Sequence, residues 1–192
     1  MKLKKIIDGC RKGQRQAQQQ LFFAYSKYLM GIAIRYVKDE NSAKDIVQES
    51  FLRIFTSIQK FDYQNENAFM AWIKRITINE AIRWLKKYNN HFLEVEESTH
   101  NEAYTSKNPS ILSELYTQDL LTALQTLPQG YQVIFNLYVI EGFSHKEIGK
   151  TLNITESTSR SQLTRAKNTL KQLLNITETV YEKNIRQHRT AV

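Results

Sequence analysis

The sequence has few of the residues that interrupt helices or cross-link chains. Its 192 residues include one cysteine, two prolines and six glycines. Because proline and glycine are the main breakers of helices, the long stretches without them predict an almost wholly helical chain. The single cysteine, Cys10, offers no disulfide framework, which argues against a small secreted scaffold held together by disulfides.

The sequence also has no long apolar segment. It contains no run of about 18 apolar residues, the length that a membrane-spanning helix needs. The first residues, MKLKKIIDGCRKG, are charged and lack the apolar core of a secretory signal. We therefore expect a cytoplasmic protein that is not inserted in a membrane.

Basic residues outnumber acidic ones, and the excess is uneven. The net charge is +8 and the pI about 9.5, which favours a polyanionic partner such as nucleic acid over a membrane surface. Residues 1–88 hold 17 basic and 8 acidic residues, residues 89–127 hold 1 and 6, and residues 128–192 hold 9 and 5. The acidic middle therefore separates two basic parts.

The middle of the chain is predicted to be a flexible connector. Residues 89–109, NNHFLEVEESTHNEAYTSKNP, are polar and show no helical periodicity. We therefore predict an all-α protein with two small helical domains, residues 1–90 and 118–180. A linker at 91–117 joins them, and a polar tail follows at 181–192.

The stretch SHKEIGKTLNITESTSRSQLTRAKNTLK is predicted to form two helices joined by a turn of three residues. Ser144 and Glu147 have the spacing of a capping box at the start of the first helix. Asn153 tolerates the left-handed conformation that often ends a helix. Thr155 can accept N–H bonds at the start of a second helix, which we expect from about Glu156.

The second of these helices has an apolar side and a basic, hydroxyl-rich side. Its apolar residues, Leu163, Ala166 and Leu170, are spaced three and four apart. A lone helix fits the major groove of DNA, where Arg pairs with guanine and Ser, Thr and Lys reach bases or phosphates. An ordinary solvated helix face is the alternative. The six Lys or Arg against two Glu in residues 144–171 favour DNA.

In the first domain, two apolar stripes predict two core-facing helices. The stripes are Leu21, Tyr25, Leu29, Ile32 and Tyr36, then Ala43, Val47, Phe51, Ile54 and Ile58. The second stripe leaves an acidic and polar patch on another side of its helix: Asp45, Gln48, Glu49 and Leu52. This patch is either a solvated face or the docking site of a protein with basic residues around a pocket for Leu52.

A third helix is expected from about Asn67 to Lys87. It combines apolar residues (Phe69, Trp72, Ile73 and Ile76) with basic ones (Lys74, Arg75, Arg83, Lys86 and Lys87). Most aromatic residues here are expected in the core, although aromatic and basic residues together also suit a binder of single-stranded nucleic acid. Asn79 is either a hydrogen-bonded buried amide or a group that reads the edge of a base.

Signals for an enzyme are weak. Asp45 and Glu49 lie one helical turn apart and could ligate Mg²⁺, but no third ligand has a supporting spacing. The four histidines, His91, His100, His145 and His188, are scattered and are expected at the surface. We predict no catalytic residue, metal or cofactor. A dimeric helix-turn-helix repressor or activator and a helical adaptor that binds only proteins remain as alternatives.

Three stretches resemble the bacterial RNA polymerase sigma factors of the extracytoplasmic-function type. They are AKDIVQESFLRIF, FDYQNENAFMAWIKRITINEAIRWLKK and, after a linker, LPQGYQVIFNLYVIEGFSHKEIGKTLNITESTSRSQLTRAK. The resemblance implies sigma region 2 and sigma region 4 as the two domains. It also implies a transcription initiation factor, without chemistry of its own, that binds core RNA polymerase, directs it to promoters and helps to melt the minus-ten element.

The resemblance further implies roles for individual residues. Those that match the segment docking on the clamp helices of the largest polymerase subunit are Asp45, Gln48, Glu49, Phe51 and Leu52. Those that match minus-ten DNA binding are Phe61, Phe69, Trp72, Lys74, Asn79 and Arg83. Those that match minus-thirty-five DNA binding are Thr158, Arg160, Ser161, Thr164, Arg165 and Lys167. The flap of the second-largest subunit is a further implied partner, and the sequence leaves open whether an anti-sigma factor binds.

A few positions depart from the family pattern. Gly149 stands where Ala is usual, and Asn153 where Gly is usual in the turn. Ser159 replaces an inward-facing apolar residue; its hydroxyl can bond back to the preceding turn of its own helix, but apolar burial worth about 1 kcal/mol is lost. Gln162 replaces a basic residue and is expected to be exposed. We expect an altered promoter preference on an unchanged fold.

Overall fold

The computed structural model describes residues 2–89, 93 and 121–189, with only the backbone described for residues 174–189. The chain divides into two compact units, Met1–Asn90 and His91–Val192, which are considered separately below. The described residues form helices and turns without a strand, so the predicted all-α class with two helical domains is confirmed. The predicted linker at 91–117 lies outside the described residues except for Leu93.

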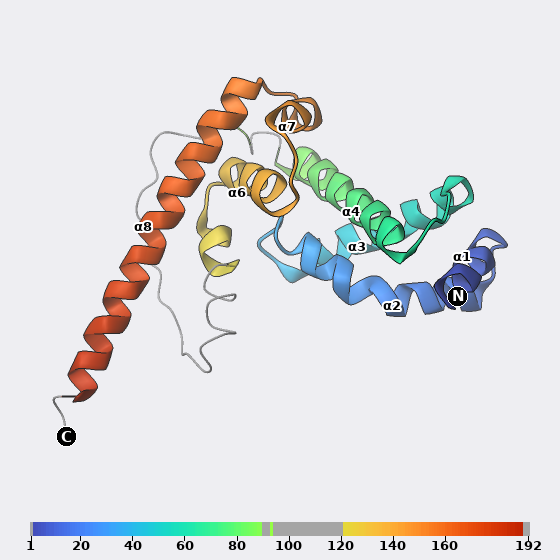
Figure 1. Cartoon of the computed structure of the whole chain (residues 1–192), viewed down its shortest axis with the longest axis horizontal. Helices are drawn as coiled ribbons and strands as arrows, with labels where there is room; N and C mark the ends of the chain where they lie inside the picture. The colour runs from blue at the N-terminus through green and yellow to red at the C-terminus, as the bar shows by residue number, and fades with distance from the viewer. Residues whose placement is uncertain (1, 90–92, 94–120, 190–192) are drawn as a thin grey trace. The chain divides into compact units, whose positions relative to one another are not determined.

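The first unit is built from helices that pack along one another (Figure 1). Their bounds are α1 Lys2–Arg11, α2 Arg15–Ala33, α3 Glu40–Ser57, the 3₁₀ turn η1 Ile58–Lys60, and α4 Glu66–Tyr88. Both predicted apolar stripes are buried, as is Phe69 of α4. The spacing of apolar residues therefore located the core of α2 and α3 correctly.

Side-chain caps fix where two of these helices begin. The carboxylate of Asp39 accepts a hydrogen bond from the backbone N–H of Ser42, with 2.8 Å between the heavy atoms, at the start of α3. The side-chain oxygen of Asn65 accepts from the N–H of Ala68 at 2.9 Å at the start of α4. Each cap satisfies an N–H group that has no partner within its helix.

The sequence analysis did not predict α1. Its sequence, KLKKIIDGCR, is strongly charged, yet Ile7 and Cys10 are buried. The Arg11 side chain donates hydrogen bonds to the carbonyl oxygens of Ile58 and Phe61. The spacing of Leu3, Ile6, Ile7 and Cys10, at i, i+3, i+4 and i+7, was the available signal for this helix.

The second unit contains the predicted helix-turn-helix. Its described elements are a helical segment at 121–126, α6 Gln129–Phe135, the π-helical turn η2 Asn136–Ile140, α7 His145–Leu152 and α8 Glu156–Arg189. The capping box of Ser144 and Glu147 is present at the start of α7. Asn153 ends this helix with φ 61° and ψ 48°, the predicted left-handed conformation.

The helix α8 packs against α6 and α7 along its first turns. The predicted inward-facing residues Leu163, Ala166 and Leu170 are buried. Ala166 and Leu170 join a core cluster with Ala123, Leu124, Leu127 and Tyr131. The backbone of α8 continues to Arg189, beyond residue 180, where the predicted domain ended. The core therefore fixes which side of the first half of α8 faces outward.

Gly149 allows α7 to approach the turn that follows it. A Cβ atom at this position would lie 2.8 Å from the carbonyl oxygen of Ile154, which is closer than real Cβ atoms come to a backbone atom. The alanine that is usual in the family would not fit this turn without a shift of the backbone.

We therefore expect Gly149→Ala to destabilise the second unit by about 1–3 kcal/mol, the usual cost of overpacking. Both tryptophans, Trp72 and Trp84, lie in the first unit. Thermal unfolding followed by tryptophan fluorescence should stay unchanged, while helix loss followed by circular dichroism should begin at a lower temperature.

Gly31→Ala is the matched control, because nothing lies within 4 Å of a Cβ at Gly31. Replacing glycine by alanine in an open helical position stabilises by about 0.5–1 kcal/mol. An unfolding temperature of the second unit that Gly149→Ala leaves unchanged would contradict the close approach described here.

Candidate functional site

The outward face of α8 presents five of the six predicted DNA-binding residues of the second unit. Arg160, Ser161, Thr164, Arg165 and Lys167 are exposed, and Thr158 is half-buried. They share one side of the helix because the buried Leu163, Ala166 and Leu170 occupy the other. The structure therefore gathers cations and hydroxyl groups on a single helix of the size that enters a DNA major groove.

Thr158 belongs to the capping turn of α8. Its backbone N–H donates to Thr155 Oγ1 at 3.0 Å, and the two hydroxyl oxygens lie 2.8 Å apart. This confirms the prediction that Thr155 caps α8. Thr158 is thus anchored at the helix start while its neighbours on the face extend into solvent.

The neighbouring Arg160 forms an exposed ion pair with Glu156 that can be broken easily. Its Nη1 atom lies 3.4 Å from Glu156 Oε2, one turn earlier, and both side chains are about half exposed. An exposed pair of this kind contributes little to stability, since solvent screens it. Arg160 can therefore exchange Glu156 for a base edge or a phosphate at small cost.

A polar contact joins α7 to α8 where an apolar one was expected. His145 Nδ1 lies 2.9 Å from Ser159 Oγ, and Ser159 is fully buried. The Ser159 hydroxyl, which could have bonded back along its own helix, contacts the His145 ring nitrogen of α7. His145 is also no ordinary surface histidine, since its ring stacks on Tyr138 with 4.4 Å between centroids.

The surroundings of His145 favour its neutral form. Burial lowers the pKa of the His145 imidazole, and the nearby positive charge of Arg160 lowers it further. A neutral imidazole keeps one ring nitrogen as an acceptor for the Ser159 hydroxyl or one N–H as its donor. The pair therefore holds α7 and α8 together without adding a charge beneath the outward face of α8.

Gln162 corrects a second expectation. The prediction that it is exposed is wrong: Gln162 is buried, and its Nε2 donates to the carbonyl oxygen of Leu93 at 3.2 Å. The backbone at Leu93 covers this position of α8, a contact between residues 69 apart that helical periodicity cannot reveal. Gln162 therefore lies on the buried side of α8, where it contacts the backbone at Leu93, and is absent from the outward face.

In the first unit, the acidic patch of α3 is exposed as one surface. Asp45, Gln48, Glu49 and Leu52 all face solvent, and Leu52 is 59% exposed. Phe51 does not share this surface: it is 4% exposed, and its ring centroid lies 4.8 Å from that of Phe22. The structure thus brings together four of the five predicted polymerase-binding residues and places the fifth in the core beneath them.

Two exposed aromatic residues of α2 border this region and were missed. Phe22 and Phe23 follow the buried Leu21 and both are exposed, and Phe22 contacts Phe51 of α3. Successive residues of a helix point about 100° apart, so three in a row cannot all face the core. The three successive apolar residues of LFF were therefore the available signal that at least one large aromatic side chain is exposed.

An aromatic cluster lies between η1 and α4. Phe61 stacks on Trp72 with 4.5 Å between centroids and an interplanar angle of 24°. Phe69 contacts both rings from below and is fully buried. Phe61 and Trp72 are half-buried and so present flat surface to solvent. Phe69 is the buried member of this group, whereas Trp84 is also half-buried and Tyr88 is exposed, so the expectation that most aromatic residues here lie in the core is wrong.

The polar residues of α4 occupy different environments. Asn79 is exposed, so the buried-amide alternative is wrong. Lys74 is half-buried, and Arg83 is 57% exposed. Asn79 and Arg83, one helical turn apart, therefore lie on one open face of α4 with the half-buried Trp72, whereas Lys74 lies on another side of the helix.

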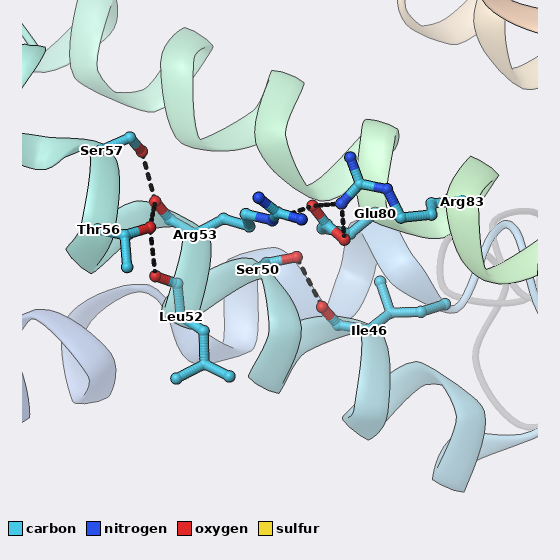
Figure 2. Close-up of polar contacts among 8 residues, drawn as sticks. All are labelled: Ile46, Ser50, Leu52, Arg53, Thr56, Ser57, Glu80 and Arg83. Carbon is cyan, nitrogen blue, oxygen red and sulfur yellow. Dashed lines mark hydrogen bonds and ion pairs between the residues drawn. The ribbon is translucent and has the colours of Figure 1, made fainter.

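A buried carboxylate stands beside Arg83. The Glu80 side chain is 8% exposed and contacts Arg83 of its own helix and Arg53 of α3 (Figure 2). Arg83 Nη1 donates to Oε1 at 2.6 Å and to Oε2 at 2.8 Å, and Arg53 Nε lies 3.3 Å from Oε1. The sequence analysis did not single out Glu80 or Arg53.

Other features of the chain bear on metal binding, thiol reactivity and membranes. Within the described ranges, no group of three or more His, Cys, Asp and Glu residues is placed to hold a metal ion. Burial raises the pKa of the Cys10 thiol to about 11, which makes it a poor nucleophile at neutral pH. None of the helices described is both long enough and apolar enough to span a bilayer.

Comparison with known families matches both units. Residues 21–91 match the family described as "Sigma-70 region 2", and residues 117–170 match "Sigma-70, region 4". The chain is 28% identical over 173 residues to the "ECF RNA polymerase sigma-E factor" of Haemophilus influenzae, covering 84% of this chain and 89% of that protein. It is 27% identical over 185 residues to the "ECF RNA polymerase sigma factor SigW" of Bacillus subtilis, covering 91% and 97%.

A solved structure shares the fold. It is that of "the sigma factor RpoE in complex with the anti-sigma factor NepR" from Bartonella quintana, with a TM-score of 0.50 and 21% identity. The match covers 82% of this chain and 96% of that one.

Proposed function

The chain belongs to the sigma-70 family of bacterial RNA polymerase sigma factors, in its extracytoplasmic-function type, and from this we propose how its two units divide the work. As a sigma factor it is a transcription initiation factor, which binds core RNA polymerase, directs it to specific promoters and helps to melt the minus-ten element. In our proposal residues 1–90 act as region 2, residues 118–180 act as region 4, and residues 91–117 connect them.

The acidic face of α3 is the proposed docking surface for the clamp helices of the largest polymerase subunit. Leu52 is the apolar anchor, and Asp45, Gln48 and Glu49 surround it with acceptors for basic residues of the partner. Phe51, being buried, supports this face by packing against Phe22. An apolar anchor within a polar rim is the usual plan of a protein interface.

The aromatic cluster and the open face of α4 are the proposed minus-ten surface. Phe61 and Trp72 offer stacking surface for an unpaired base, with Phe69 holding both from below. Exposed Asn79 can read a base edge, and Lys74 and Arg83 supply charge to the DNA backbone. Extruding a base costs a few kcal/mol, which stacking and edge hydrogen bonds can offset.

The outward face of α8 is the proposed reader of the minus-thirty-five element, and it is the observation that carries the proposal. The residues are Thr158, Arg160, Ser161, Thr164, Arg165 and Lys167. The left-handed Asn153 and the Ser144 cap set α7 against α8 as in DNA-binding helix-turn-helix units. Two DNA contacts on one chain raise joint affinity by effective concentration, so each can be weak alone.

The remaining parts of the proposal concern setting and partners. The chain carries no chemistry of its own, needs no cofactor and acts in the cytoplasm beside the polymerase. The flap of the second-largest subunit is a further partner for region 4. An anti-sigma factor is another candidate partner, because the sigma factor of Bartonella quintana with this fold was solved in such a complex.

Transcription in vitro tests the proposal. Purified core polymerase without any sigma factor should initiate at defined genomic start sites only after this chain is added, and sequencing the transcripts would map those sites. If well-folded chain directs no initiation, the proposed function is refuted. Transcription that starts equally on promoter and non-promoter DNA would indicate an adaptor without promoter recognition.

A further inference from the structure

Glu80 is a buried carboxylate that none of the roles above uses. A carboxylate with 8% of its side chain exposed has lost most of its hydration, and such a group is tolerated only when it is paired. Its partners come from two helices: Arg53 from α3 and Arg83 from α4. A single negative charge therefore holds two guanidinium groups at the junction of these helices.

Both arginines keep N–H donors that do not contact Glu80. Their side chains are 58% and 57% exposed, and all contacts of Arg83 with Glu80 pass through Nη1. A guanidinium group has five N–H donors in a rigid plane, so Nη2 and Nε of Arg83 keep donors for a second acceptor. The two contacts from Nη1 to the carboxylate anchor this end of the guanidinium group before any ligand arrives.

The same carboxylate connects the two proposed binding surfaces of the first unit. Arg53 directly follows Leu52, and in Figure 2 its side chain reaches toward Glu80 while Leu52 points the other way. The carbonyl oxygen of Arg53 also accepts hydrogen bonds from Thr56 Oγ1 and Ser57 Oγ at the end of α3. Glu80 thus ties the docking helix to the DNA-binding helix beside the residue that anchors the polymerase.

We propose that Glu80 is a positioning residue for the minus-ten DNA, which orients Arg83 so that its outward N–H groups meet a backbone phosphate. The inference rests on the proposed function, since it assumes that Arg83 contacts DNA. An arginine whose guanidinium group is already anchored near its binding position loses less conformational freedom on binding than one that moves freely. The phosphate then adds to the Glu80 pairing and does not replace it, because the buried carboxylate keeps its partners.

The substitution Glu80→Gln distinguishes the two possible roles of Glu80, because they predict opposite changes in DNA affinity. It keeps the volume of the side chain and removes its charge. If Glu80 only neutralises nearby arginines, the variant gains positive charge and should bind DNA more tightly. If Glu80 positions Arg83, the variant should bind a forked promoter fragment about 10-fold more weakly, comparable to one lost hydrogen bond to a charged group.

The assay uses the complex of core polymerase with this chain and a fluorescent forked fragment from a start site mapped by the transcription assay. Salt titrations accompany each affinity, because loss of one phosphate contact lowers the salt dependence by roughly one unit. We expect Glu80→Gln and Arg83→Ala to show the same reduced slope. Combined, they should weaken binding no more than either does alone, a result that a merely structural role would not produce.

Glu40→Gln is the matched control, since Glu40 forms an exposed pair with Lys44 on α3, with 2.8 Å between the charged atoms. It removes the same charge from the same unit and should not weaken DNA binding. If Arg83→Ala has no effect, the assignment of Arg83 to DNA fails. If Arg83→Ala weakens binding while Glu80→Gln does not, or strengthens it, the positioning role is overturned. A melting curve of each variant separates these outcomes from loss of folding.

Discussion

Replacing Leu52 by aspartate is expected to lower the affinity of the chain for core RNA polymerase by about 100-fold, because truncating a central interface anchor costs about 2–4 kcal/mol. A carboxylate in the same pocket would also be buried without a partner. Leu52 is 59% exposed, so its replacement removes little from the core of the first unit. The affinity can be measured by fluorescence anisotropy with labelled chain and purified core, and thermal unfolding should remain close to that of the unmodified chain.

Tyr88→Asp provides the matched control. Tyr88 lies in the same unit at the end of α4, and its exposure of 62% equals that of Leu52 within a few per cent. The change introduces the same charge at a large exposed apolar residue, and it should leave binding to core unchanged. Equal losses for both variants would indicate a general effect of acidic charge. No loss for Leu52→Asp would remove α3 from the docking surface.

Periodicity and capping predicted the core helices α2 and α3 and the helix-turn-helix, although α1 was missed. The stripes from Leu21 and Ala43 repeat every three or four residues, and a helix with such a stripe has a single way to bury it. Ser144, Asn153 and Thr155 predicted the boundaries of the helix-turn-helix because each satisfies backbone groups locally. These effects act between residues within one or two helical turns, so they can be predicted from the local sequence.

The errors and omissions concern contacts between residues distant in sequence. Gln162 is buried because the backbone at Leu93 covers it, and Ser159 bonds to His145 from another helix. The Glu80 pairing with Arg53 likewise joins two helices. None of these pairs leaves a periodic signal, because each depends on how elements pack in three dimensions.

Phe51 illustrates the limit of assigning sites by resemblance. It matches the family's docking segment and also lies in the apolar stripe of α3, and the structure places it inside. A matched segment identifies a surface as a whole, whereas burial decides which of its residues can touch a partner. The roles of the exposed residues remain predictions. Because each side chain is exposed, its role can be tested by substituting that residue alone.

Arg160→Ala is expected to weaken recognition of the upstream promoter element by about 5- to 100-fold, the range for losing an arginine that pairs with a guanine. The side chain lies on the outward face of α8, and among the described residues it forms an exposed ion pair with Glu156. The fold should therefore be unaffected, and so should binding to core polymerase, because the proposed clamp-helix surface lies on α3 and the outward face of α8 is not assigned to the flap contact. Footprinting of the polymerase complex on promoters that carry or lack the upstream element measures this loss.

Glu156→Gln separates DNA recognition from the ion pair itself. It breaks the same contact from the other side and leaves Arg160 in place. Since it also removes a negative charge near the DNA, binding to the upstream element should be unchanged or slightly stronger. Parallel losses in both variants would trace the effect to the helix start. If Arg160→Ala weakened core binding as much as upstream recognition, α8 could not be a dedicated DNA reader, because a base contact in the groove has no reason to alter docking through another unit.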